Sequence, residues 1–175
     1  MGNNITFQGN PLKLSGNSPQ AGQSAPAFTV TSQDMKSVTL ANFKGKIKLI
    51  STFPSLDTPV CDLQVKEFNK RASSLSSDVA VIGVSKDLPF AQKRFCSENS
   101  IKNETVLSDY KTSSFGLAYG LLIEGLYLLA RSVMIIDKDD VVRYFQIVPE
   151  LTTPPDYDAA LKALESVIKD PALKK

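Results

Sequence analysis

The amino-acid sequence of 175 residues predicts an α/β domain in which strands and helices alternate. The run IKLISTF at residues 47–53 is rich in β-branched and apolar side chains, as interior strands are. Beyond it, Val65, Phe68, Ala72 and Leu75 recur at spacings of three, four and three, which indicates one apolar stripe along a helix. A chain of this length can bury a core that is stable without disulfides or metals.

The other elements follow from the same patterns, taken in chain order. Residues 5–14 predict a hairpin, with strands over 5–7 and 12–14 around the turn residues Gly-Asn-Pro, and a loop rich in Ser, Gly, Gln and Pro spans 15–26. The elements expected after this loop are strands at 27–31, 37–40 and 47–53, a helix at 59–74, a strand at 79–85, a helix at 89–98 and a strand at 104–107. Because strands and helices alternate from residue 47 on, those strands should pair in parallel through right-handed crossovers.

The end of the chain departs from this alternation. Residues 131–137 and 141–148 flank the turn Lys-Asp-Asp and predict an antiparallel hairpin. The last helix carries an apolar stripe with spacings of four, three and four, formed by Tyr157, Leu161, Leu164 and Ile168. This order of elements is that of a thioredoxin-like fold with an added N-terminal β-hairpin. We expect one domain over residues 1–175, with the hairpin extension in 1–16.

The composition is typical of a soluble globular protein. Hydrophobic residues make up 42% and charged residues 22% of the chain. The formal net charge of +2, with no basic run beyond Lys174 and Lys175, argues against nucleic acid as a partner. Met1, Gly2 and Thr6 match a myristoylation pattern, but the segment around Thr6 fits a strand better.

The sequence shows neither a secretory signal nor a membrane-spanning segment. The first residues lack the basic and apolar regions of a secretory signal. The longest apolar stretch, residues 117–130, is interrupted by Gly120, Glu124 and Gly125 and is too short to span a bilayer. We therefore expect a cytoplasmic protein that does not act at a membrane.

The chain has two cysteines and no histidine, which restricts its chemistry. Catalysis by Ser-His-Asp or Cys-His groups is impossible without histidine, and two isolated cysteines make a poor zinc site. The sequence contains no Cys-x-x-Cys, no Gly-x-Gly-x-x-Gly and no P-loop motif. Of the classes of chemistry considered, this leaves cysteine redox chemistry without a metal or cofactor.

Cys61 closes the run Pro54-Ser-Leu-Asp-Thr58-Pro-Val-Cys61, which joins the strand at 47–53 to the following helix. Pro59 suits the first helical turn, where its missing N–H costs nothing. A thiol there faces unpaired backbone N–H groups and the positive end of the helix dipole, which favour the nucleophilic thiolate. The alternative is a small buried hydrophobic residue, the commoner role of a lone cysteine.

These residues resemble the peroxiredoxins, whose signature Pro-x-x-x-Thr/Ser-x-x-Cys is met by Pro54, Thr58 and Cys61. The resemblance narrows to the thiol peroxidase subfamily, an atypical two-cysteine group. The segments that carry it, in chain order, are Thr58-Pro-Val-Cys61-Asp, Asp87-Leu-Pro-Phe-Ala-Gln-Lys-Arg-Phe-Cys96, Leu128-Leu-Ala-Arg131 and Pro155-Asp-Tyr-Asp-Ala-Ala160. Lys86 stands where the subfamily often has a small residue.

The resemblance assigns roles to five residues, each with a simpler alternative. Cys61 would be the peroxidatic and Cys96 the resolving cysteine, since position 66 is Lys and the tail after residue 156 has no cysteine. Thr58 would hold its hydroxyl against the thiolate and the peroxide, or merely cap the helix. Pro54 would exclude water from the thiol, or merely form a turn. Arg131 would stabilise the thiolate and polarise the peroxide, or form a surface ion pair.

The resemblance therefore implies reduction of hydrogen peroxide and organic hydroperoxides through a sulfenic acid and an intramolecular Cys61–Cys96 disulfide. Thioredoxin would be the reductant, and the family forms homodimers through the face around the active site. Two other classes stay open on sequence alone. A thiol-disulfide oxidoreductase would normally show Cys-x-x-Cys, and a silent thioredoxin-like binding module would need neither Thr58 nor Arg131 near the thiol. We assign no chemistry to Asp57 or Asp62.

Overall fold

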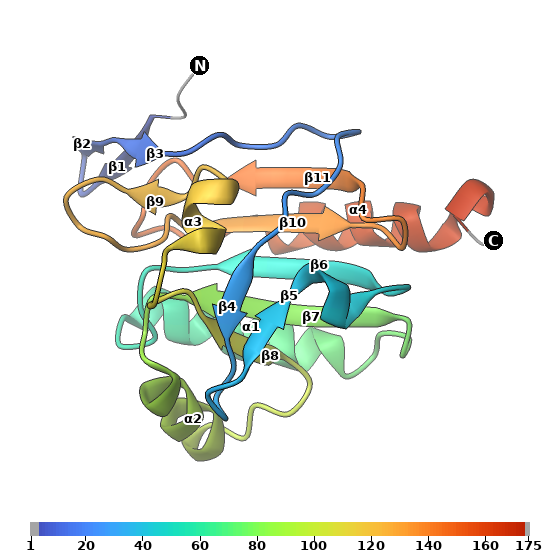
Figure 1. The fold of residues 1–175 in the computed structure, drawn as a ribbon, viewed down its shortest axis with the longest axis horizontal. Helices are drawn as coiled ribbons and strands as arrows, with labels where there is room; N and C mark the ends of the chain where they lie inside the picture. The colour runs from blue at the N-terminus through green and yellow to red at the C-terminus, as the bar shows by residue number, and fades with distance from the viewer. Residues whose placement is uncertain (1–3, 174–175) are drawn as a thin grey trace.

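The computed structural model describes residues 4–173, and a seven-stranded mixed sheet forms its centre (Figure 1). The strand order is β11-β10-β6-β7-β8-β4-β5. The three parallel strands in the middle are β6 (Ile47–Thr52), β7 (Val79–Ser85) and β8 (Thr105–Ser108). Every residue of β6 is buried, which agrees with its mostly apolar and β-branched sequence, although Lys48 and Ser51 are polar. The expected parallel core is confirmed.

Antiparallel strands complete the sheet on both sides. The hairpin of β10 (Ser132–Ile136) and β11 (Val142–Ile147) pairs with β6, with Met134 opposite Ile50. On the other side, β4 (Thr29–Thr31) pairs with β8 and with β5 (Ser37–Thr39). A short 3₁₀ helix, η1 (Leu40–Phe43), follows β5.

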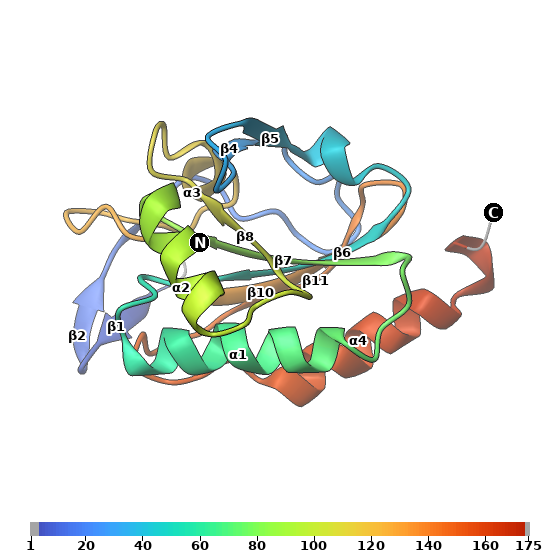
Figure 2. The same ribbon diagram turned by 90° about the horizontal axis from the view of Figure 1, so that it is seen from below.

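Helices α1 (Pro59–Ala72) and α4 (Tyr157–Lys169) cover one face of the sheet (Figure 2). Alternate strand residues point to this face, so each strand contributes every second side chain to the layer. The buried residues of this layer are Ile47, Leu49, Phe68, Val81, Val133, Ile135, Ala160, Leu164 and Val167. The apolar helix stripes that the sequence predicted are therefore the surfaces that pack on the sheet.

The opposite face is covered by the β4–β5 hairpin, by α3 (Ser114–Ala118) and by chain segments without regular structure. Phe28, Phe115 and Tyr119 form an aromatic cluster there, with the Phe115 and Tyr119 rings stacked at 4.5 Å between centroids. Neither α3 nor η1 was expected from the sequence, because both are too short to show a periodic pattern.

The two cysteine-bearing helices begin at the same end of the sheet. The chain leaves the carboxyl end of β6 to enter α1, and it leaves the carboxyl end of β7 to enter α2 (Pro89–Glu98). Because β6 and β7 are parallel, both helix N-termini lie at one edge. Open α/β sheets usually hold their functional sites at such an edge.

The N-terminal hairpin is present, but its second strand is shifted from the prediction. Strand β1 (Ile5–Phe7) pairs with β2 (Asn10–Leu12) rather than with residues 12–14. The reason is a two-residue turn, since Gln8 and Gly9 have φ of 50° and 80°. The Glu150 side chain accepts hydrogen bonds from both turn amides. Residues 14–15 instead form β3 (Leu14–Ser15), which pairs with β9 (Leu122–Ile123).

The remaining differences concern ends of elements. The 3₁₀ helix η2 (Pro171–Leu173) is the last element of the described chain. At most of their ends, the predicted strands and helices differ from the observed ones by one or two residues. Lys174 and Lys175, the basic run noted in the sequence, and Met1 and Gly2 of the myristoylation pattern lie outside the described residues. No helix within residues 4–173 is long and apolar enough to cross a bilayer.

Candidate active site

Cys61 is the third residue of α1, and its side chain is completely buried. Thr58 is the N-cap and Pro59 the first helical residue, as the sequence predicted. The helix hydrogen bonds begin with the Asp62 amide, which donates to the Thr58 carbonyl at 3.0 Å. The amides of the first turn ahead of Asp62 therefore stay available at the entrance to the thiol.

Arg131 contacts the Cys61 sulfur directly. Its Nη2 donates to Cys61 Sγ at 3.3 Å and to the Leu151 carbonyl at 2.9 Å, and its Nε donates to the same carbonyl at 3.2 Å. The side chain is 1% exposed, the largest of the fully buried residues. This burial excludes the alternative of a surface ion pair.

The Arg131 guanidinium has no carboxylate partner in the part of the chain that the structure describes. A buried charge without a counter-charge is costly, because it loses its hydration and gains only dipoles in return. The one group in contact with it that can become an anion is the Cys61 thiol. The geometry therefore places a buried cation without a carboxylate partner against the Cys61 sulfur.

Gln64 completes this arrangement, and sequence reasoning missed it. Its side-chain oxygen accepts from Arg131 Nη1 at 2.7 Å, and its nitrogen donates to the Thr52 carbonyl at 3.1 Å. Gln64 is fully buried one helical turn after Cys61. A polar residue on the buried face of α1, between Cys61 and Val65, was the only sequence signal that pointed to it.

Pro54, Thr58 and Arg131 meet around a pocket of about 400 Å³ in front of the cysteine helix. The remaining lining is almost wholly apolar and comes from Phe7, Pro59, Val60, Leu126, Leu128, Leu151 and Thr152. The structure thus brings together three of the predicted site residues, with Cys61 beneath them through its contact with Arg131. Pro54 is buried in the wall of this pocket, at a bend of the chain.

Thr58 occupies the pocket wall without forming a side-chain cap. Its hydroxyl donates to the Ser55 carbonyl at 3.1 Å, and its side chain is exposed. The simple capping alternative is therefore wrong for the hydroxyl. Since this hydroxyl donates to Ser55, its lone pairs stay free to accept from a group that enters the pocket.

Cys96 lies in the last turn of α2 and is also buried, but its surroundings differ. The Gln33 side chain donates to its sulfur at 3.3 Å, from the turn between β4 and β5. Burial raises the pKa of the Cys96 thiol, and the hydrogen bond from Gln33 offsets only part of this rise. No cation within residues 4–173 contacts it. Cys96 is therefore held as a neutral thiol.

Both cysteines belong to one apolar cluster at this end of the sheet, and neither is in a disulfide. The other buried members are Phe53, Leu56, Val65, Ile101 and Val106. Asp62 pairs with Lys66 at 2.8 Å on the outer side of α1, and Asp57 is exposed. These positions agree with the absence of a chemical role for either carboxylate.

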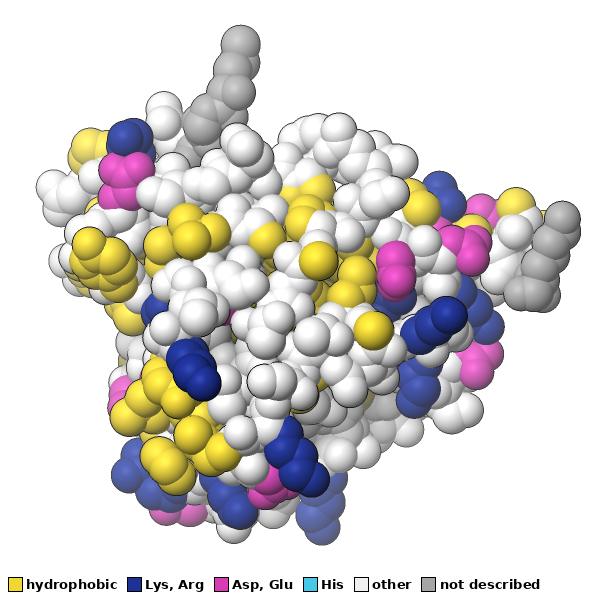
Figure 3. Space-filling view, viewed as in Figure 1, with side chains coloured by type: hydrophobic (Ala, Val, Ile, Leu, Met, Phe, Trp, Pro, Cys, Tyr) yellow, Lys and Arg dark blue, Asp and Glu magenta, His cyan; other side chains and the backbone are white. Residues whose placement is uncertain are grey.

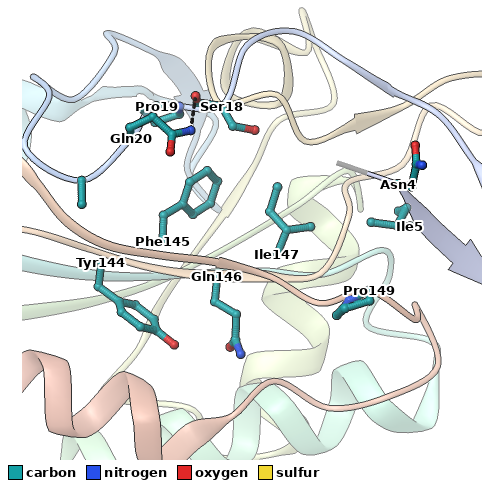
Figure 4. A pocket seen from close by; sticks show the side chains of 11 residues that line it. Asn4, Ile5, Ser18, Pro19, Gln20, Tyr144, Phe145, Gln146, Ile147 and Pro149 are labelled. Carbon is teal, nitrogen blue, oxygen red and sulfur yellow. Dashed lines mark hydrogen bonds between the residues drawn. The ribbon is translucent and has the colours of Figure 1, made fainter. Parts of the chain in front are cut away.

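A larger cavity, of about 600 Å³, lies elsewhere (Figure 4). It is bounded by β11 and the segment 18–21, with Phe145 and Ile147 on the side that faces Pro19 and Gln20. It contains neither a cysteine nor a charged side chain. No cluster of metal-ligating side chains is found among the described residues.

Comparison with known proteins shows the family of this chain. The model of the Redoxin family matches residues 20–161. The chain is 48% identical to a thiol peroxidase of Halalkalibacterium halodurans over 164 residues, which are 94% of this chain and 98% of the relative. It is also 48% identical to a thiol peroxidase of Staphylococcus haemolyticus over 163 residues, 93% and 98% of the two chains.

Solved structures show the same fold. A peroxiredoxin-like protein from Aquifex aeolicus superposes with a TM-score of 0.86 at 41% identity, over 93% of this chain and 96% of that one. A thiol peroxidase from Chromobacterium violaceum has a TM-score of 0.83 at 23% identity, over 93% and 95%. The chain therefore belongs to the Redoxin family, within the thiol peroxidase group of the peroxiredoxins.

Proposed function

We propose that the protein reduces hydrogen peroxide and organic hydroperoxides with Cys61 as the nucleophile. The thiolate sulfur attacks one peroxide oxygen, the S–O bond forms as the O–O bond breaks, and the second oxygen leaves with the electron pair. That oxygen takes up a proton and departs as water or alcohol. Sulfur is oxidised by two electrons to a sulfenic acid, and the peroxide is reduced by the same two.

The buried contact between Arg131 and Cys61 carries this proposal. It supports a thiolate in the resting protein, because the guanidinium has no other counter-ion in the described chain. The same cation is placed to stabilise the negative charge that develops on the leaving oxygen. Thr58 is proposed to hold the peroxide through its hydroxyl, and Pro54 to keep water from the sulfur.

Gln64 and the Leu151 carbonyl are proposed to hold Arg131 in place. Together they accept three of its N–H bonds, which leaves Nη2 directed at the sulfur. The apolar lining of the pocket supports an organic hydroperoxide as well as hydrogen peroxide as substrate.

The second step uses Cys96. Its thiol loses a proton and attacks the Cys61 sulfur, the S–S bond forms as the S–O bond breaks, and the hydroxide leaves with the proton as water. A dithiol reductant then returns two electrons by exchange with the disulfide. By family resemblance this reductant is thioredoxin.

A homodimer is also proposed, through the face around the active site. Three apolar side chains on the rim support it, because Phe7 is 41%, Leu126 46% and Tyr127 67% exposed. Further hydrophobic side chains gather over α2 (Figure 3), where Phe90 is among the exposed ones. A single domain over residues 1–175 and a cytoplasmic location are also proposed.

The test is peroxide consumption coupled to oxidation of reduced thioredoxin by the purified protein. The proposal predicts turnover for the wild type and none for Cys61→Ser, because the sulfur is the attacking atom. An oxidoreductase without peroxidase activity would exchange disulfides with thioredoxin but leave peroxide unconsumed. A binding module would do neither.

A further inference from the structure

The carboxylate of Asp87, between β7 and α2, accepts three hydrogen bonds from other residues. Its Oδ1 accepts from Ser55 Oγ at 2.8 Å. Its Oδ2 accepts from the Leu56 amide at 2.9 Å and from Ser85 Oγ at 2.7 Å. The carboxylate is half-buried, and hydrogen bonds to an ionised, partly buried acceptor are about twice as strong as neutral ones.

Two of these bonds reach into the loop that precedes Cys61. Ser55 and Leu56 lie between Pro54 and Thr58, the two pocket-wall residues of that loop. The Ser55 carbonyl in turn accepts from the Thr58 amide at 3.2 Å and from the Thr58 hydroxyl at 3.1 Å. Asp87 therefore fixes Ser55, and Ser55 fixes the Thr58 hydroxyl.

The third bond leads toward the helix that carries Cys96. Ser85 Oγ, held by Asp87, also accepts from Gln92 Nε2 at 3.0 Å, and the same nitrogen donates to the Leu107 carbonyl at 2.8 Å. Gln92 is fully buried in the first turns of α2. The Asp87 carbonyl accepts from Ser108 Oγ at 2.5 Å, which ties the start of α2 to β8.

From this network we propose that Asp87 is a positioning residue that couples the loop before Cys61 to the start of α2. The inference rests on the proposed function and adds a link between its two steps. Attack on peroxide needs the loop held closed around the thiolate, whereas disulfide formation needs the cysteine segments to open. A single carboxylate that bonds to both segments keeps them closed together until the sulfenic acid forms.

Loss of the carboxylate should therefore affect the two steps in opposite ways. Without the bonds to Ser55 and Leu56, the Thr58 hydroxyl is no longer fixed, and a misplaced group of this kind costs about 10- to 100-fold in rate. The opening that precedes attack by Cys96 becomes easier, because α2 is no longer tied to the loop through Asp87. Sulfenic acid formation should slow while disulfide formation keeps its rate or accelerates.

The test compares Asp87→Asn and Asp87→Ala with the wild type in single-turnover reactions with hydrogen peroxide. Rapid quenching and intact mass spectrometry follow each species, since the chain has no Trp whose fluorescence would report on it. The first step is measured in a Cys96→Ser background, where the sulfenic acid accumulates. Asp87→Asn keeps one acceptor oxygen, so its first step should fall by less than that of Asp87→Ala.

Asp57→Asn is the matched control. Asp57 lies on the same loop, is exposed and accepts no side-chain hydrogen bond within residues 4–173, so its removal changes the local charge without breaking the network. Its two rates should equal those of the wild type. If Asp87→Ala does not fold, Ser55→Ala removes one of the loop bonds and should slow the first step alone.

Two results would overturn the proposal. Equal first-step rates in Asp87→Asn, Asp87→Ala and the wild type would show that the loop does not depend on the carboxylate. A fall of both steps by the same factor would indicate a general structural role. A Cys96→Ser protein with Asp87 intact that forms no sulfenic acid would instead contradict the proposed function, and the two failures are thus distinguishable.

Discussion

At the scale of single residues, the site depends on one buried cation. The Arg131 guanidinium donates hydrogen bonds to the Leu151 carbonyl, the Gln64 side chain and the Cys61 sulfur. None of these acceptors is a carboxylate. Burying a guanidinium in this way costs stability unless an anion compensates it. In the proposed mechanism the group that Arg131 contacts, the Cys61 sulfur, is also the nucleophile, so the same contact would contribute to stability and to catalysis.

Arg131→Ala should lower the second-order rate with hydrogen peroxide by about 10²- to 10³-fold, because a donor to the developing charge is lost. Arg131→Lys should recover little, since an ammonium does not reproduce the fork that engages Gln64, Leu151 and the sulfur together. Arg143→Ala is the control, because Arg143 pairs with Asp137 away from the pocket. Stopped-flow competition for peroxide measures all three, and an unchanged rate in Arg131→Ala would remove Arg131 from the mechanism.

At the scale of elements, α2 is held to the rest of the protein by few groups. Of its ten residues only Pro89, Gln92 and Cys96 are buried, while Phe90 is 66% exposed. The loop after it is fixed at another point, where the Asn69 side chain accepts from the Lys102 and Asn103 amides. An element with so small a buried surface belongs to the segments that open first.

Turnover should therefore require local unfolding. The two sulfurs are held by different partners, Arg131 and Gln33, and a disulfide needs Cα atoms within about 4.4–6.8 Å. Hydrogen exchange should show lower protection in the disulfide form than in the reduced form around residues 88–102, around 57–66, or in both. Identical protection of both segments in the two forms would mean that neither helix end opens.

Glu104 gives the same region a dependence on pH. Its carboxyl is fully buried beside Gly83 and Ser51, and one of its oxygens has no hydrogen-bond partner in the described chain. Burial raises its pKa well above the ordinary carboxyl value, and the bond from Ser51 offsets only part of this. Cys96 is the other titratable group that faces it. The folded protein therefore holds this carboxyl protonated where the unfolded chain would ionise.

The sign of the effect follows from proton binding. Below the ordinary carboxyl pKa both states are protonated and Glu104 adds no pH dependence. As pH rises from there toward the raised folded pKa, only the unfolded state releases the proton, and the unfolding free energy falls by about 1.4 kcal/mol per pH unit. Glu104→Gln should remove this loss. The unfolding free energy of the variant, measured by urea titration, should therefore rise relative to that of the wild type as the pH is raised from 5 to 7. A constant difference across that range would contradict the raised pKa.

At the scale of the whole molecule, the sheet separates the chemistry from a structural ion pair at its other end. Lys48, near the start of β6, is fully buried and bonds to Asp140 in the β10–β11 turn, whose side chain is 38% exposed. The pocket residues lie beyond the opposite end of β6, after Thr52. Stability and peroxidase activity are thus expected to respond to different residues.

Asp140→Ala should destabilise the protein by about 3–5 kcal/mol, because it leaves a buried ammonium without a counter-charge. Lys48→Met should cost less, since Asp140 keeps contact with water. The double variant should recover most of the loss, and the peroxide rate of the folded protein should not change in any of them. Urea denaturation of the four proteins measures this, and additive losses would show that the two groups are not coupled.

The sequence predicted most of this architecture because the order of strands and helices is recorded in local periodicity. The sequence also predicts five site residues. The structure brings four of them to one pocket or into contact with its wall, namely Pro54, Thr58, Cys61 and Arg131, whereas Cys96 lies apart from the pocket. The signal for Gln64 was weak, because its contact with Arg131 joins residues 67 positions apart. The role of Asp87 could not be predicted for the same reason, because its contact with Ser55 joins residues 32 positions apart. The pairing of β3 with β9 left no local pattern in the sequence.

In the proposed cycle, Cys61 is oxidised by peroxide and Cys96 then forms a disulfide with it. Intact mass after treatment with one equivalent of hydrogen peroxide tests this most directly, in the wild type, Cys96→Ser and Cys61→Ser. We expect the wild type to lose two hydrogens, Cys96→Ser to gain one oxygen and Cys61→Ser to keep its mass. A Cys61→Ser protein that gains oxygen at Cys96 as fast as the wild type reacts would contradict it.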